Sequence, residues 1–324
     1  MRRILFGVLV VVLQAGTTQA QSLAGALEWL PPGSLSVESL TRHPEERLEG
    51  GPSDNEKPSN NEKTGQNFYT ELGRLAFRSP DMLGGTARKA GLSCQACHAN
   101  GFATKAFFIP GLSDKPGRID VSHAFWNLRG EDGVDNPIEI PSLRGVKTKE
   151  RLGGDRRTPS LRDFTRRVIV TEFAGAEPDA LLLDALVSYQ EKLQPAPVVM
   201  APVTLQQDLA DLVRYLDALR VPLAEEEATL ADRVTAMIRG QIGFIHERFA
   251  EDDMRGSRNT LEEWSRRLAA IAAQAERGQW PQARAALSEL RRAVVAPPPA
   301  LAADLPRSLY DPERLKAWIS RPVR

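Results

Sequence analysis

Apolar residues recur at steps of three and four along much of the chain, and this spacing is typical of amphipathic helices. Leu261, Trp264 and Leu268 illustrate it. The pattern predicts helices over residues 66–77, 159–172, 177–193, 205–219, 225–250 and 260–295. Gly278 and Pro281 are expected to break the last of these into a helical hairpin.

Three stretches lack this spacing and predict irregular structure. Residues 31–64 are rich in Pro, Gly, Ser, Asn, Glu and Lys, which predicts a linker that buries no core. Residues 82–92 predict a loop, and residues 100–154 predict ordered loops wrapped round something large. Asp179 is expected to cap the helix that follows it.

The composition is that of an ordinary soluble protein with room for two modest domains. The chain has 324 residues, of which 26% are charged, and its formal net charge is +0. Because electrostatic binding to many nucleic-acid phosphates needs a surplus of Lys and Arg, we expect no nucleic acid as a partner.

The first twenty residues have the three-part layout of a secretory signal. Arg2 and Arg3 precede an apolar run at residues 4–13, and Thr18 and Ala20 supply small residues for cleavage after Ala20. An uncleaved anchor is the alternative, although the run is short for a bilayer span. We therefore expect a periplasmic or otherwise exported protein that keeps no membrane span after cleavage.

The chain has only two cysteines, and they lie in Cys94-Gln95-Ala96-Cys97-His98. Cysteines at i and i+3 project from one face of a helical turn, so their sulfurs can reach two neighbouring points on one edge of a macrocycle. The histidine that follows can then ligate the iron from below. The motif is the attachment signature of one covalent c-type haem, held by Cys94 and Cys97, with His98 as the metal ligand.

Three other uses of a cysteine pair compete with haem attachment. A thioredoxin-like redox pair prefers a strand-to-helix setting in a β/α pattern, which this sequence does not show. A zinc site needs about four ligands, whereas His43, His123 and His246 are isolated in the sequence. A plain disulfide between Cys94 and Cys97 would close a loop too short to stabilise much.

Around the motif, the sequence resembles the bacterial di-haem cytochrome c peroxidase family, which includes the MauG-like proteins. The resemblance covers residues 71–193. The blocks that carry it are residues 72–80 (LGRLAFRSP), 92–98 (LSCQACH), 140–146 (IPSLRGV), 155–161 (DRRTPSL) and the closing helix at 182–193.

Two departures from that family bear on function. Family members carry two haem motifs, one for peroxide chemistry and one for electron relay, whereas this chain has one. Residues 151–157 also lack the His or aromatic residue that often precedes an Asp-Gly-Arg run in the family. The resemblance therefore implies a mono-haem relative.

The fold that these observations predict is mostly α. It comprises a cytochrome c-like haem domain with loop-rich wrapping and an added C-terminal helical region. The expected boundaries are 1–20 for the signal peptide, 21–64 for a flexible N-terminal segment, 65–221 for the haem domain and 222–324 for the helical region.

The sequence leaves the identity of the sixth iron ligand undecided. A low-spin electron carrier places Met or a second His opposite the first histidine. His123 is the only other histidine between His98 and Pro195, and a loop histidine bonded to backbone is its alternative role. Met200 and Met82 are further candidates, with packing as their alternative role. An open site that binds peroxide is also consistent with the sequence.

Two sets of side chains are candidates for contacts with the macrocycle. The guanidinium groups of five arginines have paired N–H donors that suit the carboxylates of haem propionates, with a solvated basic face as the alternative. These are Arg118, Arg144, Arg151, Arg156 and Arg157. The aromatic candidates, for which core packing is the alternative, are Phe107, Phe108, Phe125 and Trp126.

The motif, the signal-like leader and the family resemblance together predict two functions. The first is an exported mono-haem c-type cytochrome that transfers electrons to or from a redox partner protein. The alternative is a cytochrome c peroxidase-like oxidoreductase that uses peroxide at an open haem site. A third, non-catalytic interpretation is that the C-terminal helices dock a redox partner.

Overall fold

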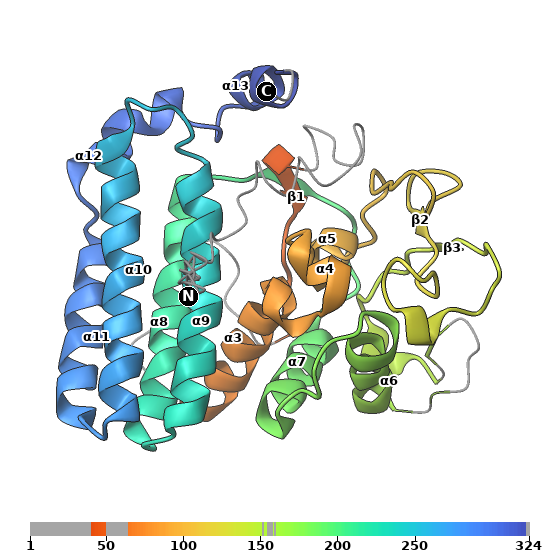
Figure 1. Ribbon diagram of the computed structural model, residues 1–324, viewed down its shortest axis with the longest axis horizontal. Coiled ribbons are helices and arrows are strands. Elements are labelled where there is room, and N and C mark those ends of the chain that lie inside the picture. Colours follow the sequence, from red (N-terminus) through yellow and green to blue (C-terminus); the bar gives the residue numbers. More distant parts are fainter. Residues whose placement is uncertain (1–39, 50–63, 151, 154–157, 159, 322–324) are drawn as a thin grey trace, which may run out of the picture.

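The computed structural model describes residues 40–49, 64–150, 152–153, 158 and 160–321. Within these residues the chain is mostly helical, as the spacing of apolar residues predicted (Figure 1). The longer helices are α3 (Thr64–Arg78), α7 (Ala180–Lys192), α8 (Leu205–Ala224), α9 (Ala228–Glu247), α10 (Arg255–Glu276) and α11 (Trp280–Val295). The shorter ones are α4 (Gly85–Lys89), α5 (Cys94–Cys97), α6 (Leu161–Arg167), α12 (Pro299–Asp304) and α13 (Pro312–Ile319).

The strands are short and form two antiparallel pairs in the described part of the chain. Strand β1 (Arg42–Pro44) pairs with β4 (Met200–Pro202), so that His43 lies opposite Ala201. Strand β2 (Arg118–Ile119) pairs with β3 (Ile138–Glu139) inside the loop-rich region. The 3₁₀ turns are η1 (Pro80–Met82), η2 (Ala99–Gly101), η3 (Leu128–Gly130), η4 (Val146–Thr148) and η6 (Leu305–Arg307), and η5 (Val168–Glu172) is a π-helical turn.

Helices α8 to α11 stand side by side at one end of the molecule (Figure 1). Their apolar stripes meet in the bundle: Leu261, Trp264 and Leu268 of α10 are each at most 2% exposed. The turn between α10 and α11 has Gly278 at φ +70°, a left-handed conformation that glycine adopts without strain. The predicted hairpin is therefore confirmed.

The crossing of α3 and α7 forms the centre of the half of the molecule that contains Cys94 and Cys97. Gly73 of α3 allows α3 and α7 to approach each other closely. Any residue with a Cβ atom would place that atom 2.0 Å from the carbonyl oxygen of Ala185. Asp179 caps α7 as predicted, since its side chain accepts a hydrogen bond from the backbone N–H of Leu181. Phe77 and Tyr189 pack across the crossing with ring centroids 5.2 Å apart.

One hydrophobic cluster extends through both halves of the described chain. It contains Phe68 and Leu186 of the α3–α7 crossing together with Trp264 and Leu287 of the helical bundle. Helix α8 joins the halves, because it packs against α3 on one side and against α9 and α11 on the other. The C-terminal helices therefore share a core with the region that contains Cys94 and Cys97, and the predicted boundary at residue 221 lies inside α8.

Three expectations about local structure differ from what is observed. The described part of the predicted linker, residues 40–49, forms β1 and buries Leu40 and Pro44. Residues 82–92, expected to be a loop, contain the short helix α4. Helix α8 continues past residue 219 to Ala224, although Pro222 has no N–H to donate to the preceding turn, and Leu223 is fully buried there.

No helix among the described residues is long and apolar enough to cross a membrane. The predicted signal peptide at 1–20 lies outside the described residues.

Candidate functional site

The cysteine pair lies on α5, a single helical turn that is separated from the 3₁₀ turn η2 only by His98. The backbone N–H of His98 donates to the carbonyl oxygen of Cys94 at 2.9 Å, which closes the turn. This turn places Cys94 and Cys97 on the same face, as their spacing predicted. Both side chains are half-buried free thiols, and both pack against the main hydrophobic cluster.

Burial controls the chemistry of the two thiols. It raises the pKa of Cys94 to about 12, and burial together with the neighbouring Cys94 raises the pKa of Cys97 to about 12. Thiols that take part in thiol–disulfide exchange have lowered pKa values, because the thiolate is the attacking form. The surroundings of this pair therefore differ from those of a redox-active dithiol.

His98 has a fixed tautomer. Its Nδ1 lies 3.0 Å from the carbonyl oxygen of Pro141. Because a carbonyl oxygen can only accept, Nδ1 carries the proton and Nε2 keeps its lone pair. Burial lowers the pKa of His98 to about 4, although the Pro141 carbonyl acts in the opposite direction. The imidazole is therefore neutral at physiological pH, with Nε2 in the form that binds a metal.

The loop that carries Pro141 is tied to the segment that follows the motif. The carbonyl oxygen of Gly101 accepts hydrogen bonds from the backbone N–H of Leu143 at 2.8 Å and from the hydroxyl of Ser142 at 3.3 Å. On the other side of the loop, the Lys149 ammonium donates to the Ser142 carbonyl at 2.9 Å. The Pro141 carbonyl is thus held in place by the bonds of the residues that follow it.

The hydrogen bond at Nδ1 of His123 has the opposite direction to the one at Nδ1 of His98. Its Nδ1 accepts a hydrogen bond from the backbone N–H of Phe125 at 3.0 Å. In a neutral imidazole this places the proton on Nε2, so His123 would have to release that contact or that proton in order to ligate through Nε2. His123 as an iron ligand stays a prediction.

The two methionine candidates and the remaining histidine of the C-terminal helices occupy defined places in the fold. Met82 lies in η1 and is 7% exposed within the main core. Met200 lies in β4, opposite Pro44 of β1. His246 lies on α9, where its Nε2 is 3.3 Å from a carboxylate oxygen of Glu262. The core position of Met82 and the pairing of His246 agree with structural roles for these two side chains.

The arginines predicted for haem propionates divide into two groups. Arg151, Arg156 and Arg157 lie outside the described residues. Arg118 pairs with Asp114 at 2.9 Å and also donates to the Pro137 carbonyl. Arg144 donates to the carbonyl oxygens of Asn100, Gln194 and Arg47 and stacks over Phe102 at 4.3 Å.

The contacts of Arg144 make it a structural residue, because three backbone carbonyls occupy its guanidinium. The sequence does not indicate this role, since backbone acceptors leave no trace in residue types. Of the aromatic candidates, Trp126 is 3% exposed and stacks edge-on against Phe173, whereas Phe125 is 40% exposed.

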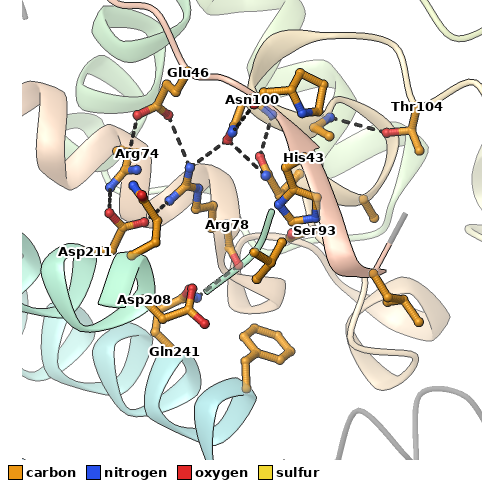
Figure 2. A pocket seen from close by; sticks show the side chains of 18 of the residues that line it. His43, Glu46, Arg74, Arg78, Ser93, Asn100, Thr104, Asp208, Asp211 and Gln241 are labelled. Carbon is orange, nitrogen blue, oxygen red and sulfur yellow. Dashed lines mark hydrogen bonds and ion pairs between the residues drawn. The ribbon is translucent and has the colours of Figure 1, made fainter. Parts of the chain in front are cut away.

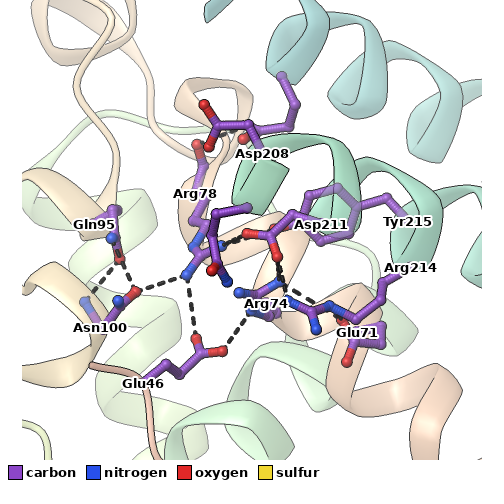
Figure 3. A network of polar contacts seen from close by, with 12 residues as sticks. Glu46, Glu71, Arg74, Arg78, Gln95, Asn100, Asp208, Asp211, Arg214 and Tyr215 are labelled. Atoms are coloured by element: carbon purple, nitrogen blue, oxygen red, sulfur yellow. Dashed lines mark hydrogen bonds and ion pairs between the residues drawn. The ribbon is translucent and has the colours of Figure 1, made fainter. Parts of the chain in front are cut away.

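A network of buried charges lies next to the motif, and Arg78 of this network donates a hydrogen bond to Asn100 (Figure 3). Arg74 of α3 bonds to Glu46 at 2.7 Å and to Asp211 of α8 at 2.8 Å. Arg78, one turn further along α3, bonds to the same two carboxylates at 3.3 and 2.6 Å. The positive charges lower the pKa of both carboxyls against the opposing effect of burial. The four groups form a neutral tetrad that links α3 and α8 to the segment after β1.

A cavity of about 290 Å³ adjoins this network (Figure 2). Its wall includes Gln95 and Ala96 from the motif, Asp208 of α8 and Gln241 of α9. The cavity therefore meets the motif at the two residues between the cysteines. The sequence predicted neither the network nor the cavity, and the only signal for them is the polar row of Glu71, Arg74 and Arg78 among the apolar residues of the same segment.

No group of three or more His, Cys, Asp or Glu residues gathers as a metal site within the described ranges. Comparisons with protein-family models, with curated proteins and with solved structures found no match. The assignment of function therefore depends on the motif and its surroundings.

Proposed function

We propose that this chain is an exported mono-haem c-type cytochrome that transfers electrons. The haem would be held by thioethers to Cys94 and Cys97, and its iron would be ligated by Nε2 of His98. The observation that carries the proposal is the contact between Nδ1 of His98 and the Pro141 carbonyl, next to two free thiols on one helical turn. A ligating histidine characteristically donates its other ring N–H to a carbonyl or carboxylate.

The residues at the motif fit a covalently bound haem. Two protonated thiols on one face are available for attachment, and a neutral imidazole whose Nε2 keeps its lone pair directly follows them. The iron would supply reversible one-electron chemistry. The chain's own residues would fix the ring orientation of His98, raise its basicity through Pro141 and keep water from the buried side of the motif.

Export and a redox partner belong to the same proposal. The signal-like residues 1–20 support export, and export would place the chain where c-type haem is attached. A single haem iron holds or releases one electron at a time. A chain that transfers electrons through it needs an electron donor and an electron acceptor, and we expect a redox partner protein to be one of them.

Peroxide chemistry at an open haem site is the second candidate. It is favoured by the geometry of His123, whose Nδ1 contact with the Phe125 backbone places the proton on Nε2. An iron ligated only by His98 would have a free face for peroxide.

Spectra and redox titration of the haem-loaded protein test the proposal and separate the two candidates. Electron transfer predicts a low-spin spectrum, reversible one-electron reduction and negligible peroxide turnover. The peroxidase alternative predicts a high-spin ferric spectrum and turnover of peroxide with an electron donor. His98→Ala, with His246→Ala as a control outside the site, should abolish the native spectrum. An unchanged spectrum in His98→Ala would refute the assignment of His98.

A further inference from the structure

Asn100 lies two residues after His98, in a backbone conformation that few residues other than glycine adopt. Its φ is 50° and its ψ 36°, which is left-handed, and it is 7% exposed. Its backbone N–H donates to Oε1 of Gln95 at 3.0 Å, and its Oδ1 accepts from Nε2 of Gln95 at 3.1 Å. Gln95 stands between the two cysteines, so Asn100 is bonded twice to the motif itself.

The remaining polar groups of Asn100 are engaged by three distant parts of the chain. Its Nδ2 donates to the carbonyl of Pro44 in β1 at 2.7 Å. Its Oδ1 also accepts from Nη2 of Arg78 in α3 at 2.7 Å. Its backbone carbonyl accepts from Nη1 of Arg144 at 3.2 Å. Both nitrogens of Asn100 donate, and each of its carbonyl oxygens accepts at least one bond, which is the arrangement expected of a residue that fixes a buried turn.

Arg78 is itself held rigidly (Figure 3). Its Nη1 donates to Asp211 at 2.6 Å and to the hydroxyl of Tyr215 at 3.2 Å, and its Nη2 lies 3.3 Å from Glu46. A guanidinium fixed at several points has little freedom to follow a movement of its partner. The position of Asn100 is therefore set by α3 and α8 as well as by the motif.

Gly101 links this turn to the loop that carries Pro141. Its carbonyl accepts from the backbone of Leu143 and from the hydroxyl of Ser142, the two residues directly after Pro141. Its φ of +84° and the 2.8 Å between a Cβ there and a methyl of Leu193 leave room only for glycine. Residues 100 and 101 thus connect the histidine to the loop of its acceptor.

We propose that Asn100 is a positioning residue for His98, which sets the contact between Nδ1 of His98 and the Pro141 carbonyl. This inference rests on the proposed haem function. Asn100 itself bonds to neither ring nor carbonyl. It fixes the two segments that carry them, one directly and the other through Gly101. If the turn loosens, the Nδ1 contact weakens, the imidazole becomes less basic, and the ferric state loses stabilisation relative to the ferrous state.

The test uses Asn100→Gly in the haem-loaded full chain, because glycine keeps the left-handed backbone and removes only the side-chain bonds. Asn136→Gly is the matched control, since Asn136 is an exposed loop residue whose side chain donates to Asp132. We expect Asn100→Gly to retain covalent haem, to have a higher reduction potential than the wild type, and to exchange the His98 Nδ1 proton with solvent at least tenfold faster. The control should match the wild type in both measurements.

A second variant shows whether the effect passes through the motif. Gln95→Ala should shift the potential in the same direction by less. In the Asn100→Gly background it should add less than it does alone, because the contact between Gln95 Nε2 and Asn100 Oδ1 is already lost and only the bond from the backbone N–H of residue 100 to Gln95 Oε1 is left to break. If Asn100→Gly fails to fold or to load haem, Gln95→Ala alone decides. An unchanged potential and proton exchange in the loaded variants, or additive shifts, would overturn the inference. A wild-type chain without haem would instead refute the proposed function.

Discussion

The crossing of α3 and α7 gives a sharp test of the fold around the motif. Ordinary van der Waals contact begins near 3.4 Å, whereas a methyl group on Gly73 would lie 2.0 Å from the Ala185 carbonyl oxygen and 2.8 Å from Cβ of Tyr189. Neither obstacle is the end of a flexible side chain. Gly73→Ala therefore forces the two helices apart by roughly 1 Å, in a core that is packed like an organic crystal.

The magnitude follows from two opposing contributions. Overpacking costs about 1–3 kcal/mol, and more where backbone has to move. Alanine returns about 1 kcal/mol of helix propensity. We therefore expect Gly73→Ala to lower the free energy of unfolding by about 2 kcal/mol, since displaced backbone places the overpacking cost at or above the top of its range.

Urea unfolding of the purified chain, followed by circular dichroism, measures this effect. Gly240→Ala is the matched control, because Gly240 lies within α9 and a Cβ there would meet nothing within 4 Å. The control should gain about 0.5–1 kcal/mol from helix propensity alone. If Gly73→Ala stabilised the chain as much as Gly240→Ala does, the close crossing would be wrong.

Three further changes have clear expected outcomes. Asp211→Asn removes the carboxylate that faces two buried arginines and should lower the free energy of unfolding in urea by about 3 kcal/mol. Asp184 lies in a half-exposed ion pair, so the control Asp184→Asn should lower it by less than about 1 kcal/mol. Burial raises the pKa of Glu247 to about 8, so the folded state binds this proton more tightly than the unfolded state does. The free energy of unfolding should therefore fall as pH rises from about 5 to 8, and this pH dependence should be lost in Glu247→Gln. Thr204→Ala removes the cap of α8 and should lower the thermal midpoint, at a cost of about 1 kcal/mol. Equal costs for the two aspartates, a pH slope that persists in Glu247→Gln, or an unchanged midpoint for Thr204→Ala would each contradict the corresponding contact.

The sequence predicted the long helices because their packing is local and periodic. In α10, Leu261, Trp264 and Leu268 mark one buried stripe, and the glycine that ends the helix adopts the left-handed turn expected of it. The face shared by Cys94 and Cys97 was predictable for the same reason, since i and i+3 meet on any helical turn.

The remaining features depend on contacts between distant residues. Strand β1 pairs with a strand about 158 positions away, as the bond from Arg42 to the Met200 carbonyl illustrates. Arg74 and Arg78 resemble solvent-exposed helix residues in sequence, and only the tertiary fold brings Glu46 and Asp211 to them. The acceptor for His98 is a backbone carbonyl, which no residue type encodes. The role of Asn100 was not predictable from sequence, because it arises from segments that meet only in space.

Mass spectrometry of the denatured protein tests the central claim most directly. The full chain, with residues 1–20 included, should be expressed in a host that attaches c-type haem, beside a variant with Cys94→Ala and Cys97→Ala. Covalent attachment predicts that the wild-type polypeptide keeps the additional mass of one haem after unfolding and stays red, whereas the variant has the mass of the processed chain alone. A wild-type chain that carries no added mass would contradict the proposed haem attachment.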